Sequence, residues 1–216
     1  MSKVLVRVVL AIFFALIFMM FLFLEKEYIS KSHESAIDEL SQSSHPRGKD
    51  LYEFVISSPE NKLWYQQNID KIRLVENGIE IQGLTFSLEN EIAPDNGSNI
   101  WNQEGNTYFS FEAAQKHAAD QGKRVPTDAE WQKLDVFLPK GQAAKFLLDV
   151  LKAPLAGFHN TYGPTIHNSG YNAYLWSATP YEAITVYRRF QKYGNSTVFR
   201  SHYEKSLGFT LRCVKG

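Results

Sequence analysis

The apolar positions of the chain follow three different patterns along its length. Residues 4–24 are apolar except for Arg7, residues 25–50 are mostly polar, and apolar residues then recur in short segments up to the C-terminus. The first pattern is typical of a membrane-spanning helix, the second of a solvated spacer and the third of a folded domain.

As a helix, residues 4–24 would be roughly 30 Å long, which is the thickness of a bilayer core. Lys3 and Arg7 lie at its start, whereas Glu25 and Glu27 follow its end, so the positive-inside rule predicts a cytoplasmic N-terminus. No small-residue cleavage site follows the run. We therefore expect an uncleaved single-pass anchor in the inner (cytoplasmic) membrane of a bacterium, with the remainder of the chain in the periplasm or outside the cell.

These patterns predict a cytoplasmic stub and transmembrane anchor over residues 1–27, a stalk over 28–50, a lead-in segment over 51–70 and a folded domain over 71–216. The stalk has few large apolar groups and ends in serine, proline and glycine, which favours a solvated spacer. A helical alternative stays open, because its few apolar residues have a loosely helical spacing that a second helix could cover.

The first part of the folded domain has the pattern of a sheet. Residues 72–81 alternate around Asn77 and Gly78, a pair that favours the positive φ angles of a hairpin turn. Gly83 then shifts the phase of the alternation, as a β-bulge would. Residues 90–106 are predicted to form a polar loop.

Three helices are expected after that loop. Ser110 can cap a helix that ends at Gln121, before a glycine. The second helix begins after Thr127, and a third is predicted over residues 142–152, between a glycine and a proline.

The start of the second helix has the most complete signal. Thr127 and Glu130 have the spacing of a capping box, in which each side chain satisfies a backbone amide at the other's position. Pro126 and Trp131 occupy the positions of a hydrophobic staple. We interpret these four residues as structural.

The remainder of the domain is predicted to be β-structure, since short apolar runs alternate with glycine, proline and asparagine. In the last run, Phe209, Leu211 and Cys213 would face one way and the residues between them the other. Helices between early and late antiparallel strands define an α+β domain. The predicted strands are residues 155–158, 173–179, 183–190, 196–202 and 209–214.

Composition narrows the function. The 23 basic residues match the 23 acidic ones, so no net field would attract nucleic acid, and we predict no nucleic-acid partner. Cys213 is the single cysteine, which excludes an internal disulfide and a clustered thiolate metal site.

The stretches YFSFEAAQKHAADQGKRVPTDAEWQKL, GYNAYLWSAT and SLGFTLRCVK resemble the Fibrobacter succinogenes major paralogous domain family, a bacterial group related to the formylglycine-generating sulfatase-modifying domains. The resemblance covers roughly residues 70–216. It implies a C-type-lectin-like fold with two to three helices and short, mostly antiparallel strands, and members that mostly have no assigned reaction. The residues that carry it are read as structural: Pro126, Thr127, Glu130, Trp131, Trp176, Gly208, Phe209, Arg212 and Cys213.

The same resemblance argues against two kinds of chemistry. Formylglycine-generating enzymes depend on a pair of copper-binding cysteines, whereas Cys213 has no partner and matches a structural cysteine. Calcium-dependent sugar binding needs clustered oxygen ligands that no segment here resembles. We therefore expect no cofactor, no metal and no enzymatic activity.

Tyrosines are concentrated between residues 159 and 203, mixed with asparagine, serine and glycine, a composition that recognition loops use. They are Tyr162, Tyr171, Tyr174, Tyr181, Tyr187, Tyr193 and Tyr203. Within the loop from residue 159 to 174 we predict a ligand-binding set of His159, Tyr162, His167, Asn168, Tyr171 and Asn172.

These signals favour a membrane-anchored, exported, non-catalytic binding module of the cell envelope, with a protein or a glycan as its partner and residues 4–24 in the membrane. One alternative is a structural or accessory subunit of a membrane complex. A second alternative is a metal-dependent enzyme, distantly related to formylglycine-generating enzymes, in which His159 and His167 bind the metal.

Overall fold

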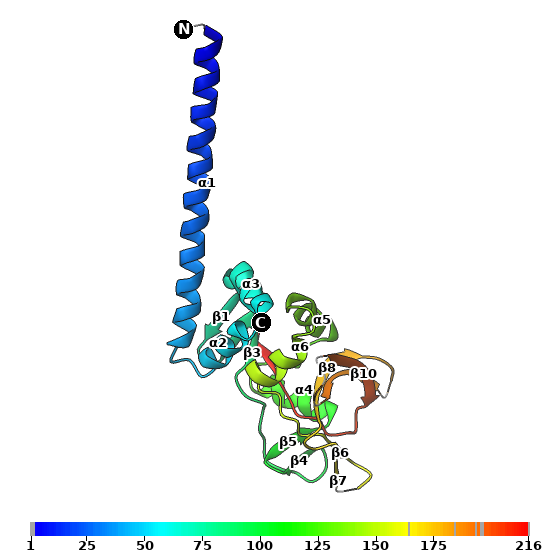
Figure 1. The fold of residues 1–216 in the computed structure, drawn as a ribbon. Coiled ribbons are helices and arrows are strands. Elements are labelled where there is room, and N and C mark those ends of the chain that lie inside the picture. The colour runs from blue at the N-terminus through cyan, green and yellow to red at the C-terminus, as the bar shows by residue number, and fades with distance from the viewer. Residues whose placement is uncertain (1–2, 164, 184, 193, 195–196, 216) are drawn as a thin grey trace. The chain divides into compact units, whose positions relative to one another are not determined.

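The computed structural model describes residues 3–163, 165–183, 185–192, 194 and 197–215, and within residues 3–12 and 185–192 it describes the backbone only. The chain divides into two compact units, residues 1–43 and 44–216. The first is one uninterrupted helix, α1, at Lys3–Ser41 (Figure 1). The first half of the predicted stalk is therefore helical.

The prediction of a membrane anchor is wrong. Among the residues that the structure describes, no helix combines the length and the apolar character needed to cross a bilayer. The side chains of residues 4–12 lie outside the described residues. The predictions of a single-pass topology and of an inner-membrane, cell-envelope location are wrong for the same reason.

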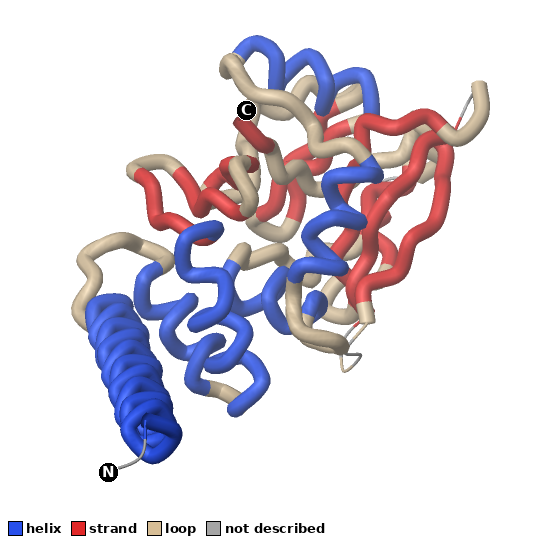
Figure 2. The backbone as a smooth tube through the Cα atoms, turned by 90° about the horizontal axis from the view of Figure 1, so that it is seen from above, coloured by secondary structure: helices blue, strands red, loops and turns tan. Residues whose placement is uncertain are grey.

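The second unit starts with two short helices, α2 at Gly48–Ile56 and α3 at Pro59–Asn68, followed by a 3₁₀ turn, η1, at Ile69–Lys71. Ser58 caps α3 by accepting a hydrogen bond from the Asn61 amide. In this unit helices lie on both sides of the strands (Figure 2).

The first described sheet is antiparallel, in the order β1-β2-β3-β11. Its strands are β1 at Ile72–Val75, β2 at Gly78–Ile81, β3 at Leu84–Ser87 and β11 at Val214–Lys215. The last strand of the chain thus pairs with a strand from the start of the domain.

Two turn predictions in this sheet are wrong. The positive φ angles belong to Gln82 and Gly83, at 51° and 80°, so these residues form the β2–β3 hairpin turn and no bulge is present. Gly78 is a strand residue paired with Val75. A Cβ atom on it would lie 2.3 Å from the carbonyl oxygen of Phe86, so glycine is needed there for close approach of the strands.

A second hairpin occupies part of the predicted polar loop. Strands β4, at Ile100–Gln103, and β5, at Asn106–Phe109, are joined by Glu104 and Gly105 with φ angles of 50° and 74°. The turn chemistry was present in the sequence, but the many polar residues around it masked the alternation.

The helices begin where they were predicted to begin. Helix α4, at Phe111–Asp120, is capped by Ser110. Helix α5, at Asp128–Phe137, contains the complete capping box of Thr127 and Glu130. The third helix is short, with α6 at Ala143–Lys145 continuing into a π-helical turn, η2, at Phe146–Val150.

Arg124 adds an ion pair to the capping box. Its guanidinium donates to both carboxylate oxygens of Glu130, at 2.7 and 2.5 Å. This hydrogen bonding and the Thr127 amide and hydroxyl lower the pKa of Glu130 to about 2, so the box remains charged at neutral pH.

The late strands form one hairpin and one sheet. Strand β6, at Phe158–Asn160, pairs with β7, at Thr165–His167. The described three-stranded sheet has the antiparallel order β10-β9-β8. Its strands are β8 at Asn172–Pro180, β9 at Thr185–Lys192 and β10 at Val198–Glu204.

The C-terminal segment, residues 207–214, is buried along its whole length. It makes isolated bridges to Phe109, His159 and Leu175 before its end pairs with β3. Both predicted faces of this segment are therefore covered, and most of it is extended chain without a continuous strand ladder.

Arg212 is the charged residue of this segment, and only 1% of its surface is exposed. Nη1 donates to the Ser87 carbonyl at 2.7 Å, and Nη2 donates to the carbonyls of Leu151 and, at 3.4 Å, Lys152. Burial lowers the pKa of Arg212 to about 10. The guanidinium therefore stays charged and joins β3 to the end of η2.

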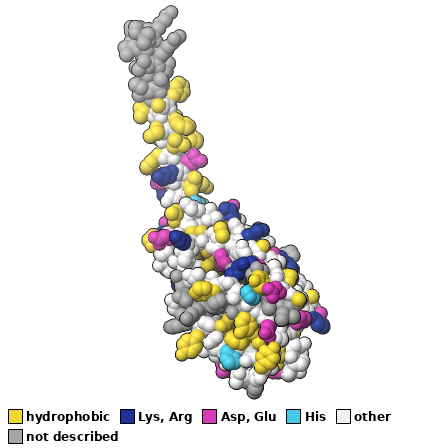
Figure 3. Space-filling view, turned by 90° about the vertical axis from the view of Figure 1, so that its right-hand side faces the viewer, with side chains coloured by type: hydrophobic (Ala, Val, Ile, Leu, Met, Phe, Trp, Pro, Cys, Tyr) yellow, Lys and Arg dark blue, Asp and Glu magenta, His cyan; other side chains and the backbone are white. Residues whose placement is uncertain are grey.

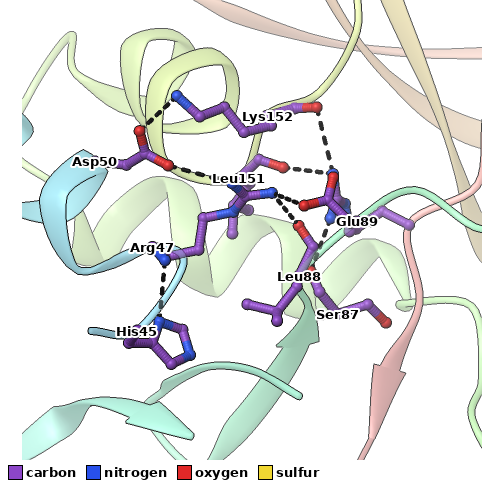
Figure 4. Close-up of polar contacts among 9 residues, drawn as sticks. His45, Arg47, Asp50, Ser87, Leu88, Glu89, Leu151 and Lys152 are labelled. Carbon is purple, nitrogen blue, oxygen red and sulfur yellow. Dashed lines mark hydrogen bonds and ion pairs between the residues drawn. The ribbon is translucent and has the colours of Figure 1, made fainter. Parts of the chain in front are cut away.

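A second buried guanidinium, that of Arg47, holds the adjoining chain (Figure 4). It donates to the Leu88 carbonyl at 2.6 Å, to Glu89 at 2.5 Å and to Asp50 at 3.2 Å. Asp50 also pairs with Lys152 at 2.7 Å. The two arginines thus tie α2, β3 and η2 together.

The chain is α+β in class, as predicted, but the predicted fold is wrong in the transmembrane helix placed before the domain.

We expect Gly208→Ala to destabilise the protein by about 1–3 kcal/mol, because overpacking costs that much. The added Cβ would lie 2.8 Å from His159 Cβ and 2.9 Å from Trp101. Chemical denaturation followed by tryptophan fluorescence measures the change. Gly163→Ala is the control, since its Cβ would have no neighbour closer than 4.0 Å. Equal unfolding midpoints for the two variants would contradict this account of Gly208.

We expect Arg212→Met to lower the free energy of unfolding by about 3 kcal/mol, because the buried Ser87 and Leu151 carbonyls lose their donors. Arg73→Met is the matched control, since Arg73 is mostly exposed and pairs with Glu80 at the surface, where a pair contributes under about 1 kcal/mol. Urea titration of both variants makes the comparison. A loss at Arg212 no larger than the loss at Arg73 would show that these hydrogen bonds contribute little.

Candidate functional site

Exposed aromatic side chains meet where the β6–β7 hairpin lies against the end of β10. Tyr162 is 81% exposed, and its hydroxyl donates to Glu204 at 3.1 Å. Tyr203, on β10, is 41% exposed, and its ring packs on that of Phe158. We call this surface, made of Phe158, Tyr162, His167, Tyr203 and Glu204, the aromatic face.

The aromatic face is connected to the core through Phe158. Phe158 is half-buried. On its outer side, its ring centroid lies 5.2 Å from that of His167 and 6.0 Å from that of Tyr203, and on its inner side 6.2 Å from that of the buried Phe209. The exposed rings of His167 and Tyr203 are therefore held in place by a packed aromatic cluster.

In Figure 3, side chains of the hydrophobic class, which includes tyrosine, lie near histidines in the lower part of the molecule. His202, on β10, stacks on Tyr181, with ring centroids 3.9 Å apart. Side chains of this kind combine a large contact area with polar groups.

His159 has a structural position. It is buried and stacks on Trp101 with centroids 4.3 Å apart, and its backbone pairs with Gly208. Burial lowers the pKa of its imidazole below the ordinary value of 6.5, against the opposing effect of the Asp95 charge. The ring is therefore neutral at pH 7.

His159 and His167 do not meet. In the β6–β7 register, Phe158 is opposite His167 and His159 is opposite Ile166. Side chains opposite one another share a face and neighbours in a strand do not, so the two imidazoles lie on opposite faces of the hairpin. No group of three or more possible metal ligands comes together within the described part of the chain.

The two predicted asparagines are engaged internally. The side-chain amides of Asn168 and Asn172 both donate to the Tyr174 hydroxyl, at 3.0 and 2.8 Å. Asn168 has a φ angle of 59°, so it also serves the turn before β8. Tyr171, beside them, is 68% exposed.

Of the predicted set, the structure brings Tyr162 and His167 into the aromatic face, leaves Tyr171 exposed nearby in the chain, and places the other three in packing or turns. The prediction missed Phe158, Tyr203 and Glu204. The alternation of β10 carried a signal for Tyr203, but its proximity to Tyr162 depends on the tertiary fold. The side chains of Tyr187 and Tyr193 lie outside the described residues.

Cys213 is fully buried. Burial and the nearby Glu91 charge raise the pKa of its thiol to about 12. It is therefore a protonated thiol at neutral pH, without the thiolate that nucleophilic or metal-binding chemistry uses.

Comparison with known protein families, curated proteins and solved structures gives no match to this chain. A C-type-lectin-like fold is not shown, and membership of the family that the sequence resembles stays a prediction.

We expect His159→Phe to remove a part of the pH dependence of stability. With a folded-state pKa below 6.5, the unfolded imidazole takes up its proton at higher pH than the folded one, so this part of the stability is present above about pH 6.5 and is lost as the pH falls. Urea unfolding at about pH 7.5 and pH 5.5 should show a smaller loss for the variant than for the parent. His167→Phe, which changes an exposed imidazole, is the control. An unchanged pH dependence in His159→Phe would refute the assignment.

Proposed function

We propose that the chain is a non-catalytic binding module that recognises the surface of a partner protein through the aromatic face. The observation that carries this proposal is the exposure of Tyr203, whose ring packs on Phe158 and through it on the core, together with the exposure of Tyr162, which hydrogen-bonds to Glu204.

The physical basis is the low entropic cost of ordering tyrosine. A tyrosine has two side-chain torsions, a large ring and a hydroxyl, so it contributes much contact area for little lost freedom. Tyr162 is already oriented by its hydrogen bond to Glu204, which lowers the cost further. Rings of this kind are frequent among the residues that dominate binding energy.

The remaining candidates draw less support. A structural or accessory subunit could use the same face to hold its complex, and the experiment below identifies the partner in either case. A metal-dependent enzyme based on His159 and His167 is not favoured, because these imidazoles lie on opposite faces of their hairpin.

The proposal predicts position-dependent crosslinking of a partner in the organism's own cells. A photoreactive phenylalanine analogue in place of Tyr162 should capture a discrete protein, identified by mass spectrometry. Adding Tyr203→Ala should reduce capture about tenfold, because a second anchor of the same face is lost.

The control carries the same analogue in place of Val136, which is 85% exposed and lies on α5. Thermal midpoints establish that each variant is folded. Equal capture from both positions, no capture from either, or capture insensitive to Tyr203→Ala would each refute the proposal.

A further inference from the structure

A cleft of about 440 Å³ adjoins the aromatic face at Glu204. It is lined by Glu112 at the start of α4, Ala183 after β8, and the run from Glu204 through Lys205 to Ser206. Because the Tyr162 hydroxyl hydrogen-bonds to Glu204, this hydroxyl lies beside a residue that lines the cleft. The cleft and the aromatic face therefore share Glu204.

The two carboxylates of the cleft have no cationic partner among the residues that the structure describes. Glu112 is exposed in the first turn of α4. Glu204 accepts one hydrogen bond, from a neutral phenol. Both charges are thus available to a ligand.

The lysine that lines the cleft, Lys205, makes its own contacts with neighbouring parts of the chain. Lys205 Nζ donates to the Ala183 carbonyl at 2.8 Å and lies 5.8 Å from the centre of the buried Phe111 ring. This ammonium braces the segment after β8 against α4. Its positive charge offsets one of the two carboxylates that line the cleft, so the charge of the lining residues stays negative.

We propose that this cleft receives an arginine side chain from a basic segment of the partner protein, an inference that rests on the proposed function and specifies the partner's chemistry. A guanidinium can donate to the two carboxylates at once, since its donors are arranged in a planar fork. It also stacks on tyrosine faces, which attract cations through the negative potential of the ring. An anionic partner segment is disfavoured by the same carboxylates.

Arginine is preferred to lysine for a geometric reason. An ammonium is a compact, strongly hydrated charge that satisfies one carboxylate well, whereas a guanidinium is weakly hydrated and spreads its donors over a larger area. A cleft lined by two carboxylates, with a tyrosine hydroxyl bonded to one of them, matches the second kind of cation.

The test is a titration of the isotopically labelled full chain with N-acetyl-arginine amide, followed by amide chemical shifts. We expect saturable shifts at residues 112 and 204–206, and affinity about tenfold higher than for the uncharged citrulline analogue. The blocked lysine should bind between the two. Affinity should fall as salt is raised, since the contact is ionic and partly exposed.

Glu204→Gln and Glu112→Gln should each weaken arginine binding about tenfold. Glu76→Gln is the matched control, because Glu76 is exposed on the β1–β2 turn, and it should leave binding unchanged. Thermal midpoints verify that the three variants are folded.

Absence of saturable shifts, equal affinity for citrulline, or binding unaffected by both cleft substitutions would overturn the inference. The proposed function can fail separately. If arginine does not bind but the Tyr162 crosslink persists and depends on Tyr203, the partner uses the aromatic face without a basic segment, and this inference alone is wrong.

Discussion

Burial of the C-terminal segment is the constraint on which the second unit depends. Residues 207–214 lie inside the unit with almost no exposed surface, so every polar group they carry needs an internal partner. The backbone finds its partners in five separate parts of the chain, at Phe109, Arg124, His159, Leu175 and β3. Arg212 directs its charge to the carbonyls of β3 and of the end of η2. The sheets, the hairpins and the end of η2 are therefore held together by their contacts with this one buried segment.

The aromatic face follows from this arrangement. Phe209, in the buried segment, is the inner end of the ring cluster that continues through Phe158 to Tyr203. Because these rings are already fixed, a partner that binds them would cause little further loss of side-chain entropy. The adjacent carboxylates of Glu112 and Glu204 would favour a positively charged segment of the partner. Under the proposed function, binding would use the same aromatic cluster that stabilises the fold.

The elements that sequence reasoning predicted well are those decided by neighbouring residues. Ser110, Thr127 and Glu130 specify helix starts within four positions, because a capping side chain reaches only its own first turn. The β4–β5 hairpin was missed although Glu104 and Gly105 supply its turn. Its apolar pairs lie away from the turn and the pairs beside the turn are polar, so its strands lack a clear alternation. The predicted anchor was wrong, since no helix among the described residues combines the length and the apolar character needed to cross a bilayer.

The sequence by itself determined the α+β class, the starts of three helices and the concentration of tyrosine in the last third of the chain, because these depend on local spacing and composition. Only the tertiary structure decided that His159 is buried on Trp101, that His167 faces the other way, and that Glu204 lies beside Tyr162. The physical reason is that a side chain's partner across a sheet is set by register and by long-range packing, neither of which local sequence encodes.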